Sequence, residues 1–134
     1  MIIEETSSQS ILVHIERFTL NKDLQLEAKE EFKELCISSG AGVCAEVSCK
    51  IDRPSPNYFV KLGKLNEIKQ LLKANKCGLV IFNNDLSPSQ ERNLEKYLGT
   101  RVLDRSSLIL DIFATRATSH IGKLQVELAQ LTHL

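Results

Sequence analysis

Residues 79–99 have the sequence LVIFNNDLSPSQERNLEKYLG and contain a complete strand, turn and helix signal. The apolar run at 79–82 is rich in β-branched and aromatic residues, which is typical of a strand buried on both faces. Ser87 is placed to cap a helix, Pro88 suits the first helical position, and Gln90 completes a capping box. The glycine at the end of the stretch suits a helix C-terminus. These residues predict a buried strand that leads through a polar turn into a helix.

The same alternation of strand and helix signals extends in both directions from this stretch. Apolar runs predict further strands at 11–15, 43–49 and 102–103. Apolar residues at helical spacing predict one helix over 24–35 and another over 65–72. Every crossover is longer than about a dozen residues, the length that a parallel connection requires. The chain is therefore predicted to be α/β, with a small open parallel sheet of about four strands and flanking helices.

The last segment has a different periodicity. Its apolar residues alternate between spacings of four and three, as in a coiled-coil seam: Leu110, Ala114, Ala117, Ile121, Leu124, Leu128 and Leu131. Such a seam needs a second helix to bury its leucines, and no cap or turn residue follows it. We expect an α/β lobe over 1–106 and, over 107–134, the start of a long projecting helix. The chain is then one module of a longer protein; the alternative is a true C-terminus that frays or docks against the chain's own domain.

Composition limits the possible partners. The 17 basic and 17 acidic side chains cancel, so no overall field attracts the protein to nucleic acid or to an anionic membrane. Any contact with RNA must therefore come from a local patch. The first ten residues resemble neither a signal peptide nor a transit peptide, and no apolar run approaches the roughly 18 residues that cross a bilayer. We expect a cytoplasmic protein without a membrane span.

The four cysteines, Cys36, Cys44, Cys49 and Cys77, form no CxxC pair and have no histidine at zinc-finger spacing. We expect each to be a small buried side chain with a free thiol in a reducing compartment. A redox or metal role is the less favoured alternative.

Polar residues follow the predicted strands at the carboxyl edge of the sheet, where open parallel sheets bind ligands. They are Lys50, Arg53, Asn83, Asn84, Asp85, Asp104, Arg105 and Ser106. Asp85 has the position of the phosphorylated aspartate of a receiver domain, but such a domain needs an acidic pair after its first strand to hold magnesium. Glu16-Arg17-Phe18 stands there instead. We therefore expect Asp85 to bracket the turn into the next helix.

No complete catalytic or nucleotide-hydrolysis motif is present. Gly63-Lys64 resembles the end of a GxxxxGK[ST] phosphate-binding loop, but Tyr58 stands at its first glycine and Leu65 at its hydroxyl residue. The three histidines do not combine with a serine and an aspartate into a recognisable constellation. We predict no catalytic residue, no cofactor site and no metal site in this chain.

Five basic residues fall at loop or helix positions that could share one face. They are Lys61, Lys64, Arg105, Arg116 and Lys123. We take them as candidate contacts to RNA phosphates. Solvation of an ordinary surface is the alternative explanation for any one of them.

Three blocks of sequence resemble the N-terminal domain of the HflX family of ribosome-associated GTPases. Residues 80–95 are similar to a family block in which VIF, two polar residues, ELSPSQ and RNLE run together. Residues 104–117 and 122–131 look like the next two family blocks, in the same order. One departure lies before the second predicted helix, where family members commonly have GxGK and Lys61-Leu62 here precede Gly63-Lys64.

The resemblance implies a parent protein that binds the large ribosomal subunit, hydrolyses GTP with magnesium in a separate downstream domain, and helps to split or rescue ribosomes. This chain would be its ribosome-binding module, in contact with ribosomal RNA and with the downstream GTPase domain. The resemblance also implies that the unpaired seam is the first helix of a long antiparallel pair. The alternative left open by the residues is a small enzyme domain that binds a nucleotide or phosphate in the strand-end loops.

Overall fold

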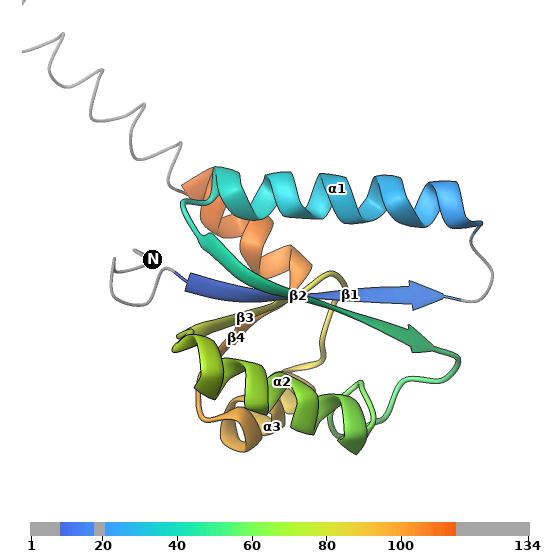
Figure 1. Cartoon of the computed structure of the whole chain (residues 1–134), viewed down its shortest axis with the longest axis vertical. Coiled ribbons are helices and arrows are strands. Elements are labelled where there is room, and N and C mark those ends of the chain that lie inside the picture. Colours follow the sequence, from blue (N-terminus) through green and yellow to red (C-terminus); the bar gives the residue numbers. More distant parts are fainter. Residues whose placement is uncertain (1–8, 18–20, 115–134) are drawn as a thin grey trace, which may run out of the picture.

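The computed structural model describes residues 9–17 and 21–114, whose backbone forms a sheet with helices on both faces (Figure 1). The sheet has four strands in the order β2-β1-β3-β4, and each neighbouring pair is parallel. The strands are β1 (Gln9–Arg17), β2 (Gly42–Ile51), β3 (Leu79–Phe82) and β4 (Arg101–Leu103). The helices between them are α1 (Lys22–Ser38), α2 (Leu62–Asn75) and α3 (Pro88–Leu98), and residues 105–114 are also helical. The predicted α/β class and small parallel sheet are confirmed.

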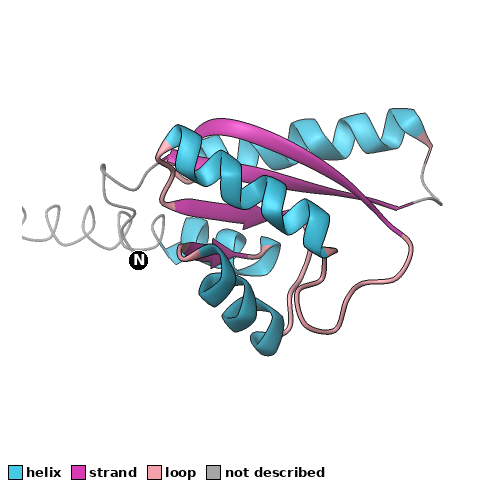
Figure 2. Ribbon diagram, turned by 60° about the horizontal axis from the view of Figure 1, so that its bottom comes forward, coloured by secondary structure: helices cyan, strands magenta, loops and turns pink. Residues whose placement is uncertain are grey.

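Helices cover both faces of the sheet (Figures 1 and 2), and an apolar core lies on each face. Alternation along β1 divides its residues between them, because successive side chains of a strand point to opposite faces. Ile11 and Val13 belong to the core under α2 and α3, whereas Leu12 belongs to the core under α1 and residues 105–114. All four residues of β3 are buried, as the continuous apolar run predicted. The strands thus carry both cores and leave their carboxyl edge to the loops.

The α3 N-terminus forms as predicted. Ser87 caps the helix by accepting a hydrogen bond from the backbone N–H of Gln90 (3.1 Å), and the Gln90 side chain accepts one from the Ser87 N–H (2.9 Å). Pro88 occupies the first turn and lacks only a donor that would have no helical partner there. Gly99 ends the helix in the left-handed conformation, with φ of 67°. The quoted stretch therefore determines α3 by itself.

The long elements extend further than their apolar residues predicted. β1 pairs with β2 from Gln9 to Arg17, well beyond the apolar run at 11–15, because backbone ladder bonds form regardless of side-chain polarity. α1 begins after Asn21, whose side chain accepts a hydrogen bond from the Leu24 N–H at 2.8 Å. Asn21 is therefore the N-cap of α1. The exposed Leu24 and Leu26 take no part in the cores.

The prediction of four free thiols is wrong for two of the cysteines. Cys44 of β2 and Cys77, which follows α2, form a disulfide across 33 residues of sequence. α2 runs antiparallel to the strands and returns the chain to the amino end of β2, so the fold brings together two cysteines whose spacing gave no signal. Cys36 and Cys49 are buried and free, as predicted.

The C-terminal predictions are only partly described. Residues 105–114 start the predicted projecting helix, and within it Leu108 and Ile112 are buried in the core under α1. Leu110 and Phe113 of the same segment are exposed. The seam from Ala117 onwards lies outside the described residues, as do Arg116 and Lys123. The division into a lobe at 1–106 and a helix from 107 stays a prediction. Within the described ranges, no helix is long and apolar enough to cross a membrane.

Candidate functional site

A hollow of about 680 Å³ lies where the carboxyl end of β2 meets the amino end of α2. We call it the β2–α2 hollow. Its buried lining residues are Cys49, Ile51 and Phe59, each less than a tenth exposed. Its remaining lining is polar, and consists of Lys50, Asp52, Arg53, Lys61, Gly63 and Lys64. The hollow therefore combines an apolar wall with a basic rim.

The wall depends on an unusual backbone conformation in the loop before α2. Phe59 has φ of 67°, in the left-handed region that residues other than glycine rarely adopt. A short bridge holds it there, since Ser55 and Phe59 exchange two backbone hydrogen bonds of 3.0 and 2.9 Å. The side chain remains only 6% exposed. Such a conformation costs about 1–3 kcal/mol and persists only where surrounding contacts enforce it.

Two side chains of α3 supply further contacts to this loop. Gln90 donates from Nε2 to the Ser55 carbonyl at 2.9 Å, and Asn93 donates from Nδ2 to the Asn57 carbonyl at 3.1 Å. Both residues belong to the stretch that also determines α3. The loop is thus held at Ser55 and at Asn57, so the hollow has a wall of fixed position.

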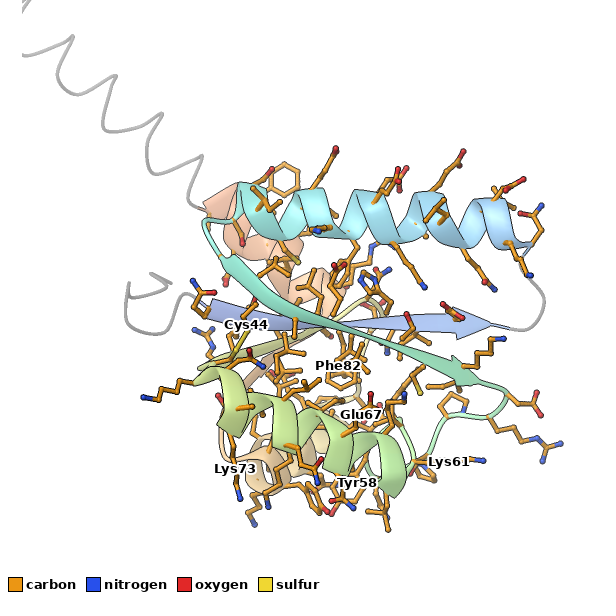
Figure 3. All side chains as sticks on the ribbon, viewed as in Figure 1. Cys44, Tyr58, Lys61, Glu67, Lys73 and Phe82 are labelled. Carbon is orange, nitrogen blue, oxygen red and sulfur yellow. A yellow bond between two sulfur atoms is a disulfide. The ribbon has the colours of Figure 1, made fainter. Side chains whose placement is uncertain are left out.

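Positive charge predominates around the hollow. Four of its lining side chains are basic and only Asp52 is acidic. Lys64 Nζ pairs with Glu67 Oε2 at 2.9 Å on the first turns of α2, whereas Lys61 lies at the N-cap position (Figure 3). The N-cap makes no side-chain hydrogen bond to the helix, and the first turn contains no acidic residue. The partial positive charge of the α2 N-terminus therefore adds to that of the lysines.

The pKa of the Cys49 thiol depends on both burial and the charges at the hollow. Burial raises the pKa of its thiol, while the positive charges of Lys64 and Lys61 act in the opposite direction. Glu67 and Glu16 add to the increase. Because burial prevails, the neutral thiol is favoured, and Cys49 contributes to the apolar wall rather than acting as a nucleophile.

The predicted RNA-contact residues are only partly brought together. Lys61 and Lys64 both line the hollow, beside Lys50 and Arg53. Arg105 follows β4, at the opposite edge of the sheet from β2, and is not part of the hollow lining. Lys50 and Arg53 were recognised in the sequence as carboxyl-edge residues but not as members of the basic set. Lys50 lies at the carboxyl end of β2 and Arg53 follows the strand, and this position was the signal that could have added them.

A second polar cluster joins the carboxyl ends of β3 and β4, and its contacts are structural. Asp104 accepts hydrogen bonds from the backbone N–H groups of Leu86 (3.1 Å) and Ser107 (2.8 Å). Burial alone would raise the pKa of this carboxyl, but the hydrogen bonds outweigh burial and lower it. Asp85 accepts from the Ser106 hydroxyl at 2.5 Å, consistent with a role in bracketing the turn. The cluster fixes the start of helix 105–114 to the loop before α3.

His14 is buried between the sheet and α1. Its Nε2 lies 2.9 Å from Glu46 Oε1, and its ring packs edge-on against Phe32 with ring centroids 5.7 Å apart. The hydrogen bond with His14 lowers the pKa of Glu46 in spite of burial, with help from Lys33. Among residues 9–17 and 21–114 there is no group of three or more His, Cys, Asp or Glu side chains that could hold a metal ion. The β2–α2 hollow is therefore the strongest candidate site in the described part of the chain.

Comparison with known proteins gives consistent results. The family model described as the N-terminal domain of GTP-binding GTPases matches residues 27–114. GTPase HflX of Escherichia coli K12 is 48% identical over 130 residues, which cover 97% of this chain and 30% of that protein. GTPase HflX of Flavobacterium psychrophilum is 35% identical over 136 residues, covering 100% of this chain and 33% of the relative.

A solved structure agrees with the family match and with the HflX relatives. The crystal structure of an SsGBP and GDP complex superposes with a TM-score of 0.64 at 27% identity, and the match covers 92% of this chain and 34% of that one. This chain spans about a third of the length of the two HflX relatives. On the family match and the identity over nearly its whole length, this chain belongs to the HflX GTPases and corresponds to their N-terminal domain.

Proposed function

We propose that this chain is the ribosome-binding N-terminal module of an HflX GTPase. In this proposal the lobe holds a cytoplasmic parent protein on RNA of the large ribosomal subunit, and the parent helps to split or rescue ribosomes. GTP and Mg²⁺ bind in a separate downstream domain rather than in the lobe. The two HflX relatives carry GTPase in their names and are about three times as long as this chain, which leaves ample length for such a domain.

The observation that carries the proposal is the gathering of Lys50, Arg53, Lys61 and Lys64 at one hollow in a chain whose formal net charge is zero. RNA presents one negative charge per nucleotide, and the affinity of proteins for it depends on lysine and arginine contacts to those phosphates. Only a concentrated basic surface gives such contacts when the whole molecule has no net field. The β2–α2 hollow is the place in the described chain that provides one.

The other predicted contacts extend this surface in the proposal. Arg105 follows the carboxyl end of β4, and the hollow lies at the carboxyl end of β2, the outer strand on the other side of the sheet. Arg116 and Lys123 follow it along the sequence, outside the described residues. We propose that all three contact ribosomal RNA along the first part of the helical arm. The alternative of a small nucleotide- or phosphate-binding enzyme is not favoured, since the relatives that match nearly the whole chain are HflX proteins.

The test is co-sedimentation of the 134-residue chain with isolated large ribosomal subunits over a salt series from about 50 to about 200 mM. The proposal predicts saturable binding that weakens with salt, with a linear dependence of log K on log salt concentration. Each phosphate contact contributes a slope of about 0.7 to 0.9. No binding, or binding that is independent of salt, would contradict the proposal.

A further inference from the structure

The size of the β2–α2 hollow exceeds what contact with an RNA backbone requires. Phosphates on a duplex lie at its surface and are reached by side chains that project outward. A hollow of about 680 Å³ is instead within the range of about 300–1,000 Å³ that is usual for small-molecule sites. Its occupant should therefore enter the protein surface rather than rest on it.

The chemistry of the lining selects the type of occupant. The wall of Cys49, Ile51 and Phe59 excludes water from an apolar, flat group, whereas Lys61 and Lys64 at the rim attract an anion. A ligand that satisfies both parts has an aromatic portion and a phosphate a few bonds apart. A nucleotide within an RNA chain has this composition.

The hollow is also formed in advance of binding. Phe59 is held by the bridge to Ser55, and Gln90 and Asn93 of α3 fix the same loop by hydrogen bonds of 2.9 and 3.1 Å. The occupant therefore does not need to order this loop. This lowers the entropic cost of binding.

We propose that the β2–α2 hollow binds one unpaired RNA nucleotide, with its base against Cys49, Ile51 and Phe59 and its phosphate at Lys61 and Lys64. The inference rests on the proposed RNA-binding function and adds a specificity to it. Bases in a duplex are stacked and paired, so they cannot enter a hollow, whereas bases of loops and bulges can turn outward. The lobe then recognises a single-stranded element and not an RNA helix.

Gly63 offers a way to fill the hollow without disturbing the fold. It lines the hollow, and a Cβ added there would meet no atom within 4 Å. Its backbone is outside the left-handed region, and replacing a helical glycine favours the helix by about 0.5–1 kcal/mol. Gly63→Leu should therefore fold and occupy space in the hollow. Ala74→Leu, which adds a side chain at an exposed position of α2 outside the hollow, is the matched control.

The experiment measures fluorescence anisotropy of the 134-residue chain with a short single-stranded RNA and with a duplex of the same length. We expect tighter binding to the single strand, and loss of about tenfold in that affinity for Gly63→Leu, since stacking of one base contributes up to this order. The affinity of Gly63→Leu for the duplex should change by less than about twofold, and so should the affinities of Ala74→Leu for both RNAs.

Free nucleotides form a separate arm of the same experiment. Competition by ATP, GTP or AMP at concentrations that match the RNA would identify a free nucleotide as the occupant and would overturn the proposal. Equal single-strand affinity for Gly63→Leu and Ala74→Leu would also overturn it. If that equality occurs while salt-dependent binding to large subunits persists, the single-nucleotide inference fails and the ribosome-binding function stands.

Crosslinking locates the base independently of affinity. RNA that contains one 4-thiouridine should crosslink on irradiation to peptides that include Cys49 to Arg53 or Phe59 to Lys64. The crosslinking yield should fall in Gly63→Leu and not in Ala74→Leu. Crosslinks confined to other surfaces would contradict the placement.

Discussion

Asp104 shows how a single carboxylate joins two parts of the fold. It is 7% exposed and accepts hydrogen bonds from the N–H groups of Leu86 and Ser107, so it caps helix 105–114 and also secures the chain that leads into α3. The two hydrogen bonds use both carboxylate oxygens as acceptors, so they require the ionised Asp104 side chain. Asp104 therefore fixes the start of helix 105–114 relative to the loop before α3.

Replacement of Asp104 by Asn should lower the free energy of unfolding by about 1–3 kcal/mol, because an amide offers one acceptor oxygen where the carboxylate offers two. Equilibrium urea unfolding of the two proteins gives the difference. Ser106→Ala removes only a hydroxyl at the exposed contact with Asp85 and is the control, with an expected change below about 1 kcal/mol.

The same residue should make stability sensitive to acid. The folded pKa of Asp104 is lowered, so its contribution is complete above the unfolded pKa and is lost as pH falls through the folded value. Glu46 and Glu16 have lowered pKa values for a different reason, since their partners are His14 and Lys29. As the pH falls from about 5 to about 2, Asp104→Asn should lose less stability than the unsubstituted chain. Equal losses would contradict the role of Asp104.

At the level of elements, α3 is the clearest link between local sequence and site. Its capping box begins the helix, and two of its side chains, Gln90 and Asn93, then hold the loop that shapes the hollow. The stretch at 79–99 was sufficient to predict the helix and its caps. It gave no sign of the loop contacts, because these join residues 35 and 36 positions apart and depend on how α3 packs.

Ser87→Ala should destabilise the protein by about 1 kcal/mol through loss of the N-cap. Ser89→Ala is the matched control, since Ser89 is exposed within the first turn and is not the cap. Thermal unfolding should show a lower midpoint for Ser87→Ala alone. Equal midpoints for the two variants would mean that the cap does not contribute.

The disulfide joins two further elements at the end of the sheet away from the hollow. It links Cys44 of β2 to Cys77 across 33 residues, a loop length for which the chain-entropy account gives about 3–4 kcal/mol of stabilisation. Reduction, or the double change Cys44→Ala and Cys77→Ala, should lower the free energy of unfolding by about this amount. Thiol titration in denaturant without reductant should find two reactive thiols in the unsubstituted 134-residue chain, those of Cys36 and Cys49. Four thiols, with no effect of reductant on unfolding, would contradict the link.

Much of the whole molecule could be predicted from the sequence, and the failures have physical causes. Apolar runs were sufficient to predict the four strands, because burial on both faces leaves a direct pattern in the residues, and the long crossovers were sufficient to predict that the strands are parallel. The ends of β1 and β2 could not be predicted, since backbone hydrogen bonds between polar residues leave no pattern in the sequence. The pairing of Cys44 with Cys77 joins residues distant in sequence, which no local pattern predicts. The left-handed Phe59 depends on its bridge to Ser55 in a loop that α3 holds from 35 and 36 positions away.

The candidate site was predicted in part for the same reason. Lys61 and Lys64 were selected as basic residues near loops, and both line the hollow. The apolar wall was not anticipated, because Cys49, Ile51 and Phe59 read as ordinary core residues until the loop is folded over them. Binding of RNA by a chain of zero formal net charge requires a local basic patch, and the hollow in the described part of the chain provides such a patch.

The most direct test of this account compares two pairs of lysines of equal charge. Lys61→Gln with Lys64→Gln removes two charges at the hollow, and Lys73→Gln with Lys96→Gln removes two exposed charges from the last turns of α2 and α3 (Figure 3). Binding to isolated large ribosomal subunits is measured for both across the salt series. The account predicts that the hollow pair weakens binding and lowers the salt slope by about 1–2, while the control pair leaves the slope unchanged. Equal slopes for the two double variants would contradict it.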